Sequence, residues 1–221
     1  MKPDSPPSAN ARHRVHRAAD RAHYDRDTIH GIVDAAYVCH VSWHDGDNVL
    51  CIPTACWRVD DHLYIHGSNG SRMMQSLAGG TQACVAITLL DGLVLAKSAF
   101  AHSMNYRSVV IHGQFSTVCA EDKPAVLAGL VEWILPGRTQ DVRAADANEL
   151  LATTVLALPL TEAAAKIRNW GPRDKEADVD LPCWSGVLPM QMQAMPSKAL
   201  DASCSTPEAV DHWSRGAVIR N

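Results

Sequence analysis

The segment Leu63–Leu77, "LYIHGSNGSRMMQSL", changes its hydrophobic period part-way along. Apolar and polar residues alternate up to His66, which predicts a β-strand. Beyond a stretch of small residues, Met73, Met74 and Leu77 recur at helical spacing and predict a short helix. A strand, a bare loop and a helix start together form a backbone arrangement in which unpaired amides can face an anion.

The side chains of this loop also suit an anion. Gly67 and Gly70 permit close approach of the main chain, and Ser68 and Ser71 offer hydroxyl groups. Arg72 carries a planar guanidinium that matches phosphate geometry. The loop matches neither the P-loop pattern nor the dinucleotide fingerprint. An ordinary helix capped by Ser71 therefore remains open as an alternative to a phosphate site.

Short strand-like runs surround this segment, and helices are few. The predicted strands are residues 37–43, 48–59, 62–67, 82–100, 106–118, 154–167 and 181–192. The predicted helices are residues 26–37, 70–77, 121–135 and 146–154, and the Ala-rich end of 154–167 leaves a helix open there. At Asp91-Gly92 the sequence allows either a hairpin turn or a kink. This arrangement favours an antiparallel barrel or sandwich. We expect one domain at 26–195, a flexible arm at 1–25 and a flexible tail at 196–221.

Composition excludes several classes of protein. The chain has 221 residues, is 47% hydrophobic and carries a net charge of −4, so no strong field favours nucleic acid or an anionic membrane. No apolar run approaches the roughly 20 residues that cross a bilayer. The seven cysteines are odd in number and form no C-x-x-C pair, which predicts a reduced, cytoplasmic protein. Residues 168–175, "RNWGPRDK", are expected to form a solvated loop.

Four blocks occur in an order that resembles a known family. They are "CIPTACW", "LYIHGSNGSRMMQSL", "SMNYRSVVIHGQ" and "WSGVLP". Over about residues 12–192 the chain resembles the pyridoxamine 5′-phosphate oxidase-like FMN-binding split-barrel superfamily, in particular its nitroimidazole-reductase branch. The resemblance implies a mostly β fold with peripheral helices: a six-stranded antiparallel split β-barrel. It also implies a homodimer that binds one FMN in each of two interfacial clefts.

The resemblance assigns roles to individual residues. It implies that Ile52, Pro53 and Thr54 run along the isoalloxazine ring. Gly67, Ser68, Ser71 and Arg72 would hold the ribityl phosphate. The neighbouring strand would contribute Tyr106, Arg107 and Ser108, and Trp184 would close the cleft of one subunit over the flavin of the other. His66 would face the flavin edge, where it could donate a proton.

These roles predict an FMN-dependent oxidoreductase. It would move a hydride or electron pair between the flavin and a small nitroaromatic- or quinone-like acceptor, with NADH or NADPH as electron donor. The C-terminal part lacks the basic R-x-H pattern of the true pyridoxamine 5′-phosphate oxidases, so that activity is not expected. Two alternatives remain: a non-catalytic FMN- or haem-binding barrel that acts as sensor, store or haem handler, and a barrel with an empty cleft.

The eleven histidines raise the question of a metal. His62 and His66 have H-x-x-x-H spacing, but in a strand such positions lie roughly 13 Å apart, too far to share an ion. No metal site is predicted. Some split-barrel relatives bind haem through a histidine, and the candidates here are His66, His102 and His112.

Overall fold

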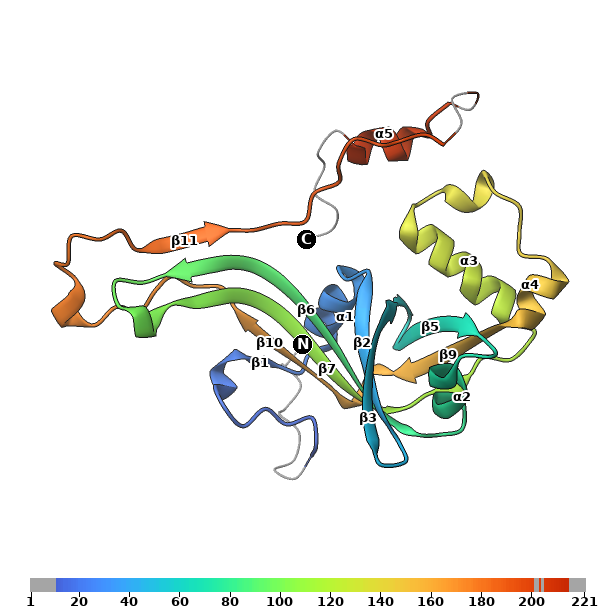
Figure 1. The fold of residues 1–221 in the computed structure, drawn as a ribbon, viewed down its shortest axis with the longest axis horizontal. Helices are drawn as coiled ribbons and strands as arrows, with labels where there is room; N and C mark the ends of the chain where they lie inside the picture. The colour runs from blue at the N-terminus through green and yellow to red at the C-terminus, as the bar shows by residue number, and fades with distance from the viewer. Residues whose placement is uncertain (1–10, 201–202, 204, 215–221) are drawn as a thin grey trace.

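The computed structural model describes residues 11–200, 203 and 205–214, which form two antiparallel sheets with peripheral helices (Figure 1). The larger sheet has seven strands in the order β1-β10-β7-β6-β2-β3, with β11 paired to β6. The smaller sheet has four strands in the order β4-β5-β9-β8. The mostly β fold is confirmed, although the described strands outnumber the six that were expected.

The elements have the following bounds. The strands are β1 (Ala22–His23), β2 (Val38–Asp45), β3 (Asn48–Ala55), β4 (Trp57–Val59), β5 (His62–Ser68), β6 (Gln82–Leu95), β7 (Ser103–Gln114), β8 (Ser116–Thr117), β9 (Thr153–Pro159), β10 (Ala163–Arg168) and β11 (Gly186–Pro189). The α-helices are α1 (Arg26–Asp34), α2 (Arg72–Ala78), α3 (Lys123–Ile134), α4 (Ala147–Ala152) and α5 (Glu208–Ser214). Five 3-10 turns are η1 (Ala19–Arg21), η2 (Ala99–Ala101), η3 (Arg138–Gln140), η4 (Leu160–Glu162) and η5 (Glu176–Asp178).

The main core lies between the two sheets. Alternate residues of each strand face inward, as the period of two requires, so that Val41, Ile65 and Ile111 are fully buried. α1 and α2 add apolar side chains to this cluster, including Val33 and Leu77. A second, smaller cluster lies under α3 and contains Trp57, Leu130 and Val155.

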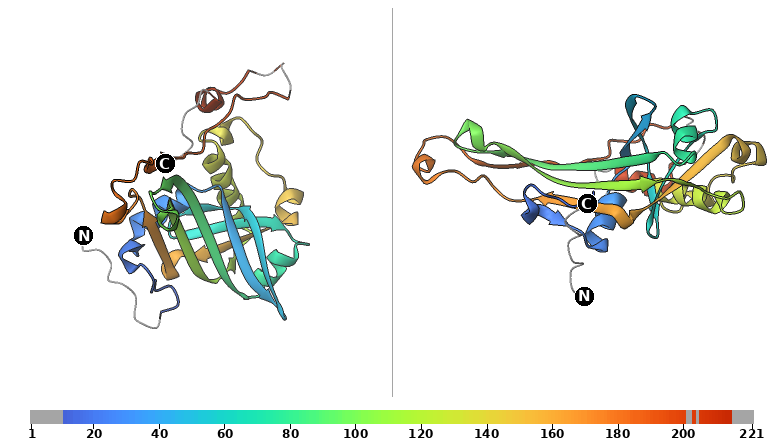
Figure 2. Two further views of the ribbon diagram at one scale, coloured as in Figure 1. Left: turned by 60° about the vertical axis from the view of Figure 1, so that its left-hand side comes forward. Right: turned by 90° about the horizontal axis from the view of Figure 1, so that it is seen from below.

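A long arm extends from the barrel (Figures 1 and 2). It consists of the far halves of β6 and β7, connected through η2, together with β11. The alternatives at Asp91-Gly92 are resolved, because β6 continues through them with a register shift between Leu90 and Gly92. A side chain at Gly92 would be crowded, since its Cβ atom would lie 3.0 Å from the carbonyl oxygen of Leu188 on β11.

The structure differs from two sequence-based expectations. Residues 154–167 were expected to form one strand, but η4 divides them into β9 in the small sheet and β10 in the large sheet. The residue pattern of this apolar, Ala-rich run does not indicate where the chain passes from one sheet to the other. Residues 11–25 of the expected arm lie against the barrel, where β1 pairs with β10 and Arg12 forms an ion pair with Glu162. Residues 1–10 lie outside the described chain.

No helix in the described part of the chain is both long and apolar enough to cross a membrane.

Candidate functional site

The loop between β5 and α2 has the predicted local structure. β5 ends at Ser68 and α2 begins at Arg72. Ser71 is the N-cap, and its hydroxyl oxygen accepts a hydrogen bond from the amide of Met74 at 3.4 Å. Gly67 approaches α2 closely, because a Cβ atom would lie 2.9 Å from the Met74 side chain. The change from strand to helix is therefore confirmed.

Most of the loop amides already have partners. The amide of Asn69 donates to the carbonyl of Ala152 at 3.1 Å, at the end of α4. The amide of Gly70 donates to the Ser68 hydroxyl at 3.3 Å, and that of Ser71 donates to the Ser68 carbonyl at 2.9 Å. The loop is thus stabilised by its own contacts and by α4. A phosphate bound here would rely on hydroxyl groups, on the first helical amides and on Arg72.

Arg72 forms an ion pair with Asp45 at the end of β2. Its side chain is 67% exposed and that of Asp45 is 29% exposed. Because the pair lies at the surface, its contribution to stability is small. An anion at α2 would compete with the Asp45 carboxylate for the guanidinium.

The exposed edge strand β3 carries Ile52, Pro53 and Thr54. β3 is the last strand in the order of the large sheet, so one of its edges has no strand partner among the described residues. Ile52 is 42% exposed. Free main-chain groups on such an edge can hydrogen-bond a flat polar ligand as well as another strand.

Tyr106, Arg107 and Ser108 follow one another on β7 and therefore alternate between the faces of the sheet. The guanidinium of Arg107 donates to the Asp91 carboxylate on β6, from Nε at 3.0 and 3.3 Å and from Nη2 at 2.8 Å. That hydrogen-bonded partner raises the pKa of Arg107. Tyr106 and Ser108 lie on the opposite face, so the structure does not place all three side chains in one cleft.

Trp184 lies on the arm, two residues before the start of β11, and is 66% exposed. Its ring crosses Gly186 so closely that a Cβ atom there would be 2.7 Å from the indole. The arm and the β5–α2 loop are at different ends of the molecule (Figure 1). Within one chain, the structure does not bring Trp184 to the predicted phosphate loop.

The ring of His66 lies against Trp57 and is only partly exposed to solvent. The two rings meet edge-on, with centroids 5.8 Å apart and planes at 63°. The Nδ1 atom of His66 is buried and has no hydrogen-bond partner among the described residues. Burial lowers the pKa of His66, so the neutral imidazole is favoured at neutral pH. A neutral imidazole is a poorer proton donor than a protonated one. His66, packed on a core tryptophan, therefore fits the expected catalytic role poorly.

The lowered pKa of His66 predicts a pH effect on stability. The unfolded chain binds more protons than the folded one between this lowered pKa and the ordinary value of about 6.5. Stability should therefore fall as the pH drops through this window, by at most about 1.4 kcal/mol per pH unit for one group. We expect His66→Phe to reduce the loss between pH 7.5 and 5.5 in urea unfolding. His44→Phe, at an exposed hairpin, is the matched control; an unchanged slope in His66→Phe would contradict the prediction.

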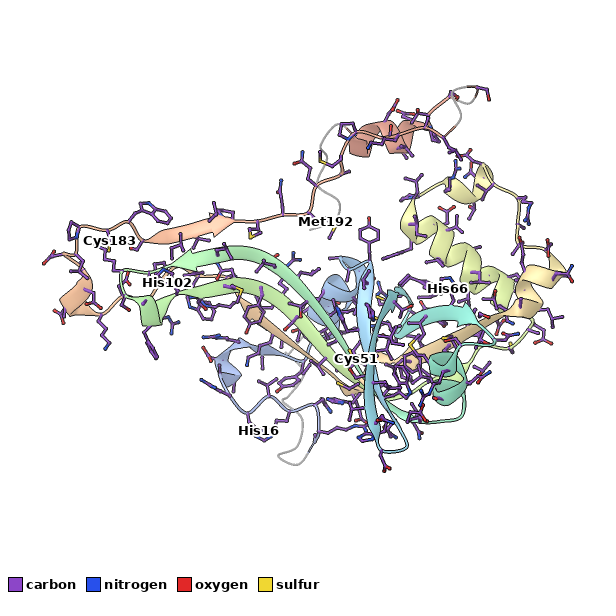
Figure 3. All side chains as sticks on the ribbon, in the orientation of Figure 1. His16, Cys51, His66, His102, Cys183 and Met192 are labelled. Carbon is purple, nitrogen blue, oxygen red and sulfur yellow. The ribbon has the colours of Figure 1, made fainter. Side chains whose placement is uncertain are left out.

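The other two histidine candidates have different surroundings. His112 lies opposite Cys84 on the large sheet. Burial first, and then the nearby charge of Arg12, lower its pKa. His102 is exposed at the far end of the arm, where its Nδ1 lies 3.0 Å from the carbonyl oxygen of Ser98. Figure 3 shows His66 on the barrel and His102 on the arm, far from each other.

One cluster of side chains was not predicted from the sequence. Three guanidinium groups surround the Trp170 ring, and they belong to Arg21, Arg168 and Arg173. The segment from 168 to 175 was expected to be a solvated loop, yet Arg168 is only 4% exposed. A signal existed in the spacing R-x-W-x-x-R, but Arg21 comes from a distant part of the chain. Among the described residues, no group of three His, Cys, Asp or Glu side chains is placed to hold a metal ion.

Comparison with known families decides the classification. Residues 25–167, more than half of the chain, match the family model described as pyridoxamine 5′-phosphate oxidase. The chain belongs to this family. No curated protein matches it.

Two solved structures resemble nearly the whole chain. The FAD and haem binding protein from Mycobacterium smegmatis is 32% identical, with a TM-score of 0.86 over 91% of this chain and 100% of that one. The flavocytochrome Anf3 from Azotobacter vinelandii is also 32% identical, with a TM-score of 0.85 over 91% of this chain and 96% of that one. A protein from Bacteroides thetaiotaomicron named for 5-nitroimidazole antibiotic resistance is 20% identical, with a TM-score of 0.55 over 66% of this chain and 86% of that one. The last likeness supports the fold alone, so the expected nitroimidazole-reductase branch is at most a distant one.

Proposed function

We propose that the protein is a flavocytochrome that binds a flavin and a haem and transfers electrons between them. The observation that supports this most is the similarity, over 91% of the chain, to a FAD and haem binding protein and to a flavocytochrome. It favours the haem-binding alternative over an FMN-dependent reductase of small nitroaromatic or quinone acceptors. The same similarity favours FAD over FMN.

The residues present fit a flavin. The free edge of β3 offers main-chain donors and acceptors to the polar edge of an isoalloxazine ring. The start of α2 offers hydroxyl groups and Arg72 to a phosphate. A bound flavin supplies two-electron chemistry and a haem supplies one-electron chemistry. The contribution of this chain is to position the two groups and to set the charge around them.

The residues also fit a haem, which needs a histidine nitrogen with a free lone pair. His102 meets this need, because its Nδ1 lies within hydrogen-bond distance of a carbonyl oxygen and its Nε2 is left for a ligand. His66 is less suited, because its Nδ1 is buried and its ring packs on Trp57.

We also propose that the protein acts as a homodimer. The predicted flavin residues are divided between the barrel and the arm, which lie apart in one chain (Figure 2). A second copy would allow the arm of one subunit to complete the cleft of the other. This arrangement would bring Trp184 close to the partner's flavin, as the family resemblance implies.

The absorption spectrum of the purified protein tests the proposed function. We expect flavin bands together with a Soret band, and chromatography of the acid-released flavin should identify FAD. Anaerobic addition of NADH or NADPH should bleach the flavin and then shift the haem bands. Flavin without haem, in protein produced with added haem precursor, would contradict the flavocytochrome and favour the reductase.

Arg72→Ala is expected to weaken flavin binding. A charge-assisted hydrogen bond contributes roughly 1.5–3 kcal/mol, which corresponds to about one to two decades in affinity. Fluorescence titration of the apoprotein measures the effect, and Arg138→Ala, which removes another surface arginine with an acidic partner, serves as the control. Equal affinity of both variants would show that the phosphate is held elsewhere.

A further inference from the structure

The end of the arm carries a basic pocket of about 330 Å³. Four of its lining residues are basic and none is acidic: the basic ones are Arg21, Arg168, Arg173 and Lys175. Phe100, His102 and Trp170 also line it. The pocket lies where η2, the end of β10 and the loop after it meet the N-terminal segment.

Arg168 is a buried cation without a carboxylate partner among the described residues. Its guanidinium donates to the side-chain oxygen of Asn105, to the carbonyl of Trp170 at 2.7 Å and to the carbonyl of Gly171 at 3.1 Å. Burial is the main cause that lowers its pKa, and the charges of two neighbouring arginines lower it further. Burying a charge without an opposite charge is costly in free energy. A negatively charged group in the pocket would therefore offset part of the cost of burying Arg168.

The other two arginines add to this positive charge. Arg21, Arg168 and Arg173 each lie 5.0–5.1 Å from the centre of the Trp170 ring. The Nε atom of Arg21 is buried and has no hydrogen-bond partner among the described residues. Cation–π contacts hold the guanidinium groups in place but do not neutralise them. The nearby carboxylate of Asp174 is directed to the amide of Lys97, at 2.7 Å.

A histidine and an exposed apolar side chain border the same pocket. Nδ1 of His102 lies 3.0 Å from the carbonyl oxygen of Ser98, and a hydrogen bond donated there leaves the lone pair of the imidazole on Nε2. Phe100, on the turn before it, is 96% exposed. A ligand that combines a metal, an apolar plane and negative groups would satisfy all three features at once.

We propose that this pocket is the haem site, in which His102 supplies an axial nitrogen and the arginines bind the propionates. Arg21 has an Nε–H without a partner among the described residues and Arg173 is exposed, so both can donate to carboxylates, while Phe100 and Trp170 offer apolar surface to the macrocycle. The inference rests on the proposed flavocytochrome function and adds the location of the haem.

The positions of the three arginines, all outside the residues matched by the family model, agree with the assignment. The match to the family model ends at residue 167, just before Arg168. The likeness to the two haem-related structures covers 91% of the chain, well beyond that model. By contrast, His112 lies near Arg12 and Glu162, which already form an ion pair.

Titration of the full chain with haemin, followed by Soret absorption, tests the ligand. We expect His102→Ala to bind haem at least about tenfold more weakly and to shift the Soret maximum. Free imidazole should restore the wild-type spectrum, which a general loss of structure would not allow. His44→Ala is the matched control, because His44 is also exposed and its Nδ1 lies 3.4 Å from the carbonyl of Gly46.

A second titration tests the propionate partners. Wild-type protein should prefer haemin over its dimethyl ester by about tenfold or more, since the ester removes both charges. Arg173→Gln should lose most of this preference, and Arg138→Gln should retain it. Arg173 is exposed, so its replacement is not expected to unfold the chain.

The outcomes separate this inference from the proposed function. If wild-type protein takes up no haem, both fail. If it binds haem but His102→Ala has the wild-type affinity and spectrum, only the location fails, and loss of haem in His66→Ala would assign it to β5. If Arg173→Gln weakens FAD binding and leaves haemin binding unchanged, the pocket binds the nucleotide end of the flavin and the inference is overturned.

Discussion

Trp57→Ala should lower the free energy of unfolding by about 3–5 kcal/mol, the cost of removing a large aromatic side chain from a core. Trp57 is completely buried and forms the centre of the cluster under α3, with Leu130 and Val155. Its ring stacks on Tyr64 at a centroid distance of 5.8 Å and meets the edge of His66. Because these neighbours belong to different elements, the cavity could not close by a small local shift.

Urea unfolding at neutral pH measures this loss. Trp184→Ala is the matched control, since the same atoms are removed from a side chain that is 66% exposed. That substitution should change stability by no more than about 0.5 kcal/mol. A loss below about 1 kcal/mol in Trp57→Ala would mean that α3 does not close over the small sheet in solution.

The local structure around the β5–α2 loop was predictable because it depends on residues that are close in sequence. Alternation before His66 and helical spacing after Ser71 both follow from how side chains project from a regular backbone. The N-cap role of Ser71, one of the two alternatives at this position, is present in the structure.

The binding partners of the loop amides and of Arg72 could not be predicted from the sequence. The amide of Asn69 is bound by Ala152, which is distant in sequence, and the guanidinium of Arg72 is paired with Asp45. Such contacts depend on tertiary packing, and residue type does not reveal them. The alternation along β7 predicts that Arg107 faces away from Tyr106. The family resemblance treated Tyr106, Arg107 and Ser108 as one group, so this alternation was not applied to them.

The basic pocket on the arm shows the same limit. In the sequence, Arg168 and Arg173 are ordinary charged residues of a loop. The structure adds Arg21 from the N-terminal segment and buries Arg168 beside Trp170. The excess of positive charge next to His102, the residue after η2, is therefore evident only in the folded structure.

One face of the large sheet carries the apolar surface that a second subunit would cover. Val38, Leu90, Met104 and Val110 are all partly exposed, at 48%, 42%, 53% and 37%. Strand alternation and the pairing of Val110 with Ala86 place these side chains on the face opposite the core. Exposed apolar groups gathered on one face favour association, and a two-fold dimer would bury each of them twice.

Val110→Arg is therefore expected to convert the proposed dimer into a monomer. A two-fold axis would bury two unpaired guanidinium groups for each substitution, and a charge without a partner costs several kcal/mol. The dissociation constant should rise by at least about a hundredfold. Light scattering after size exclusion measures the change, and the flavin and haem content should fall with it if the clefts are completed by the partner's arm. Val142→Arg is the control, because Val142 is 39% exposed and lies on the segment after α3. A wild-type protein that is already monomeric and retains both groups would contradict the dimer.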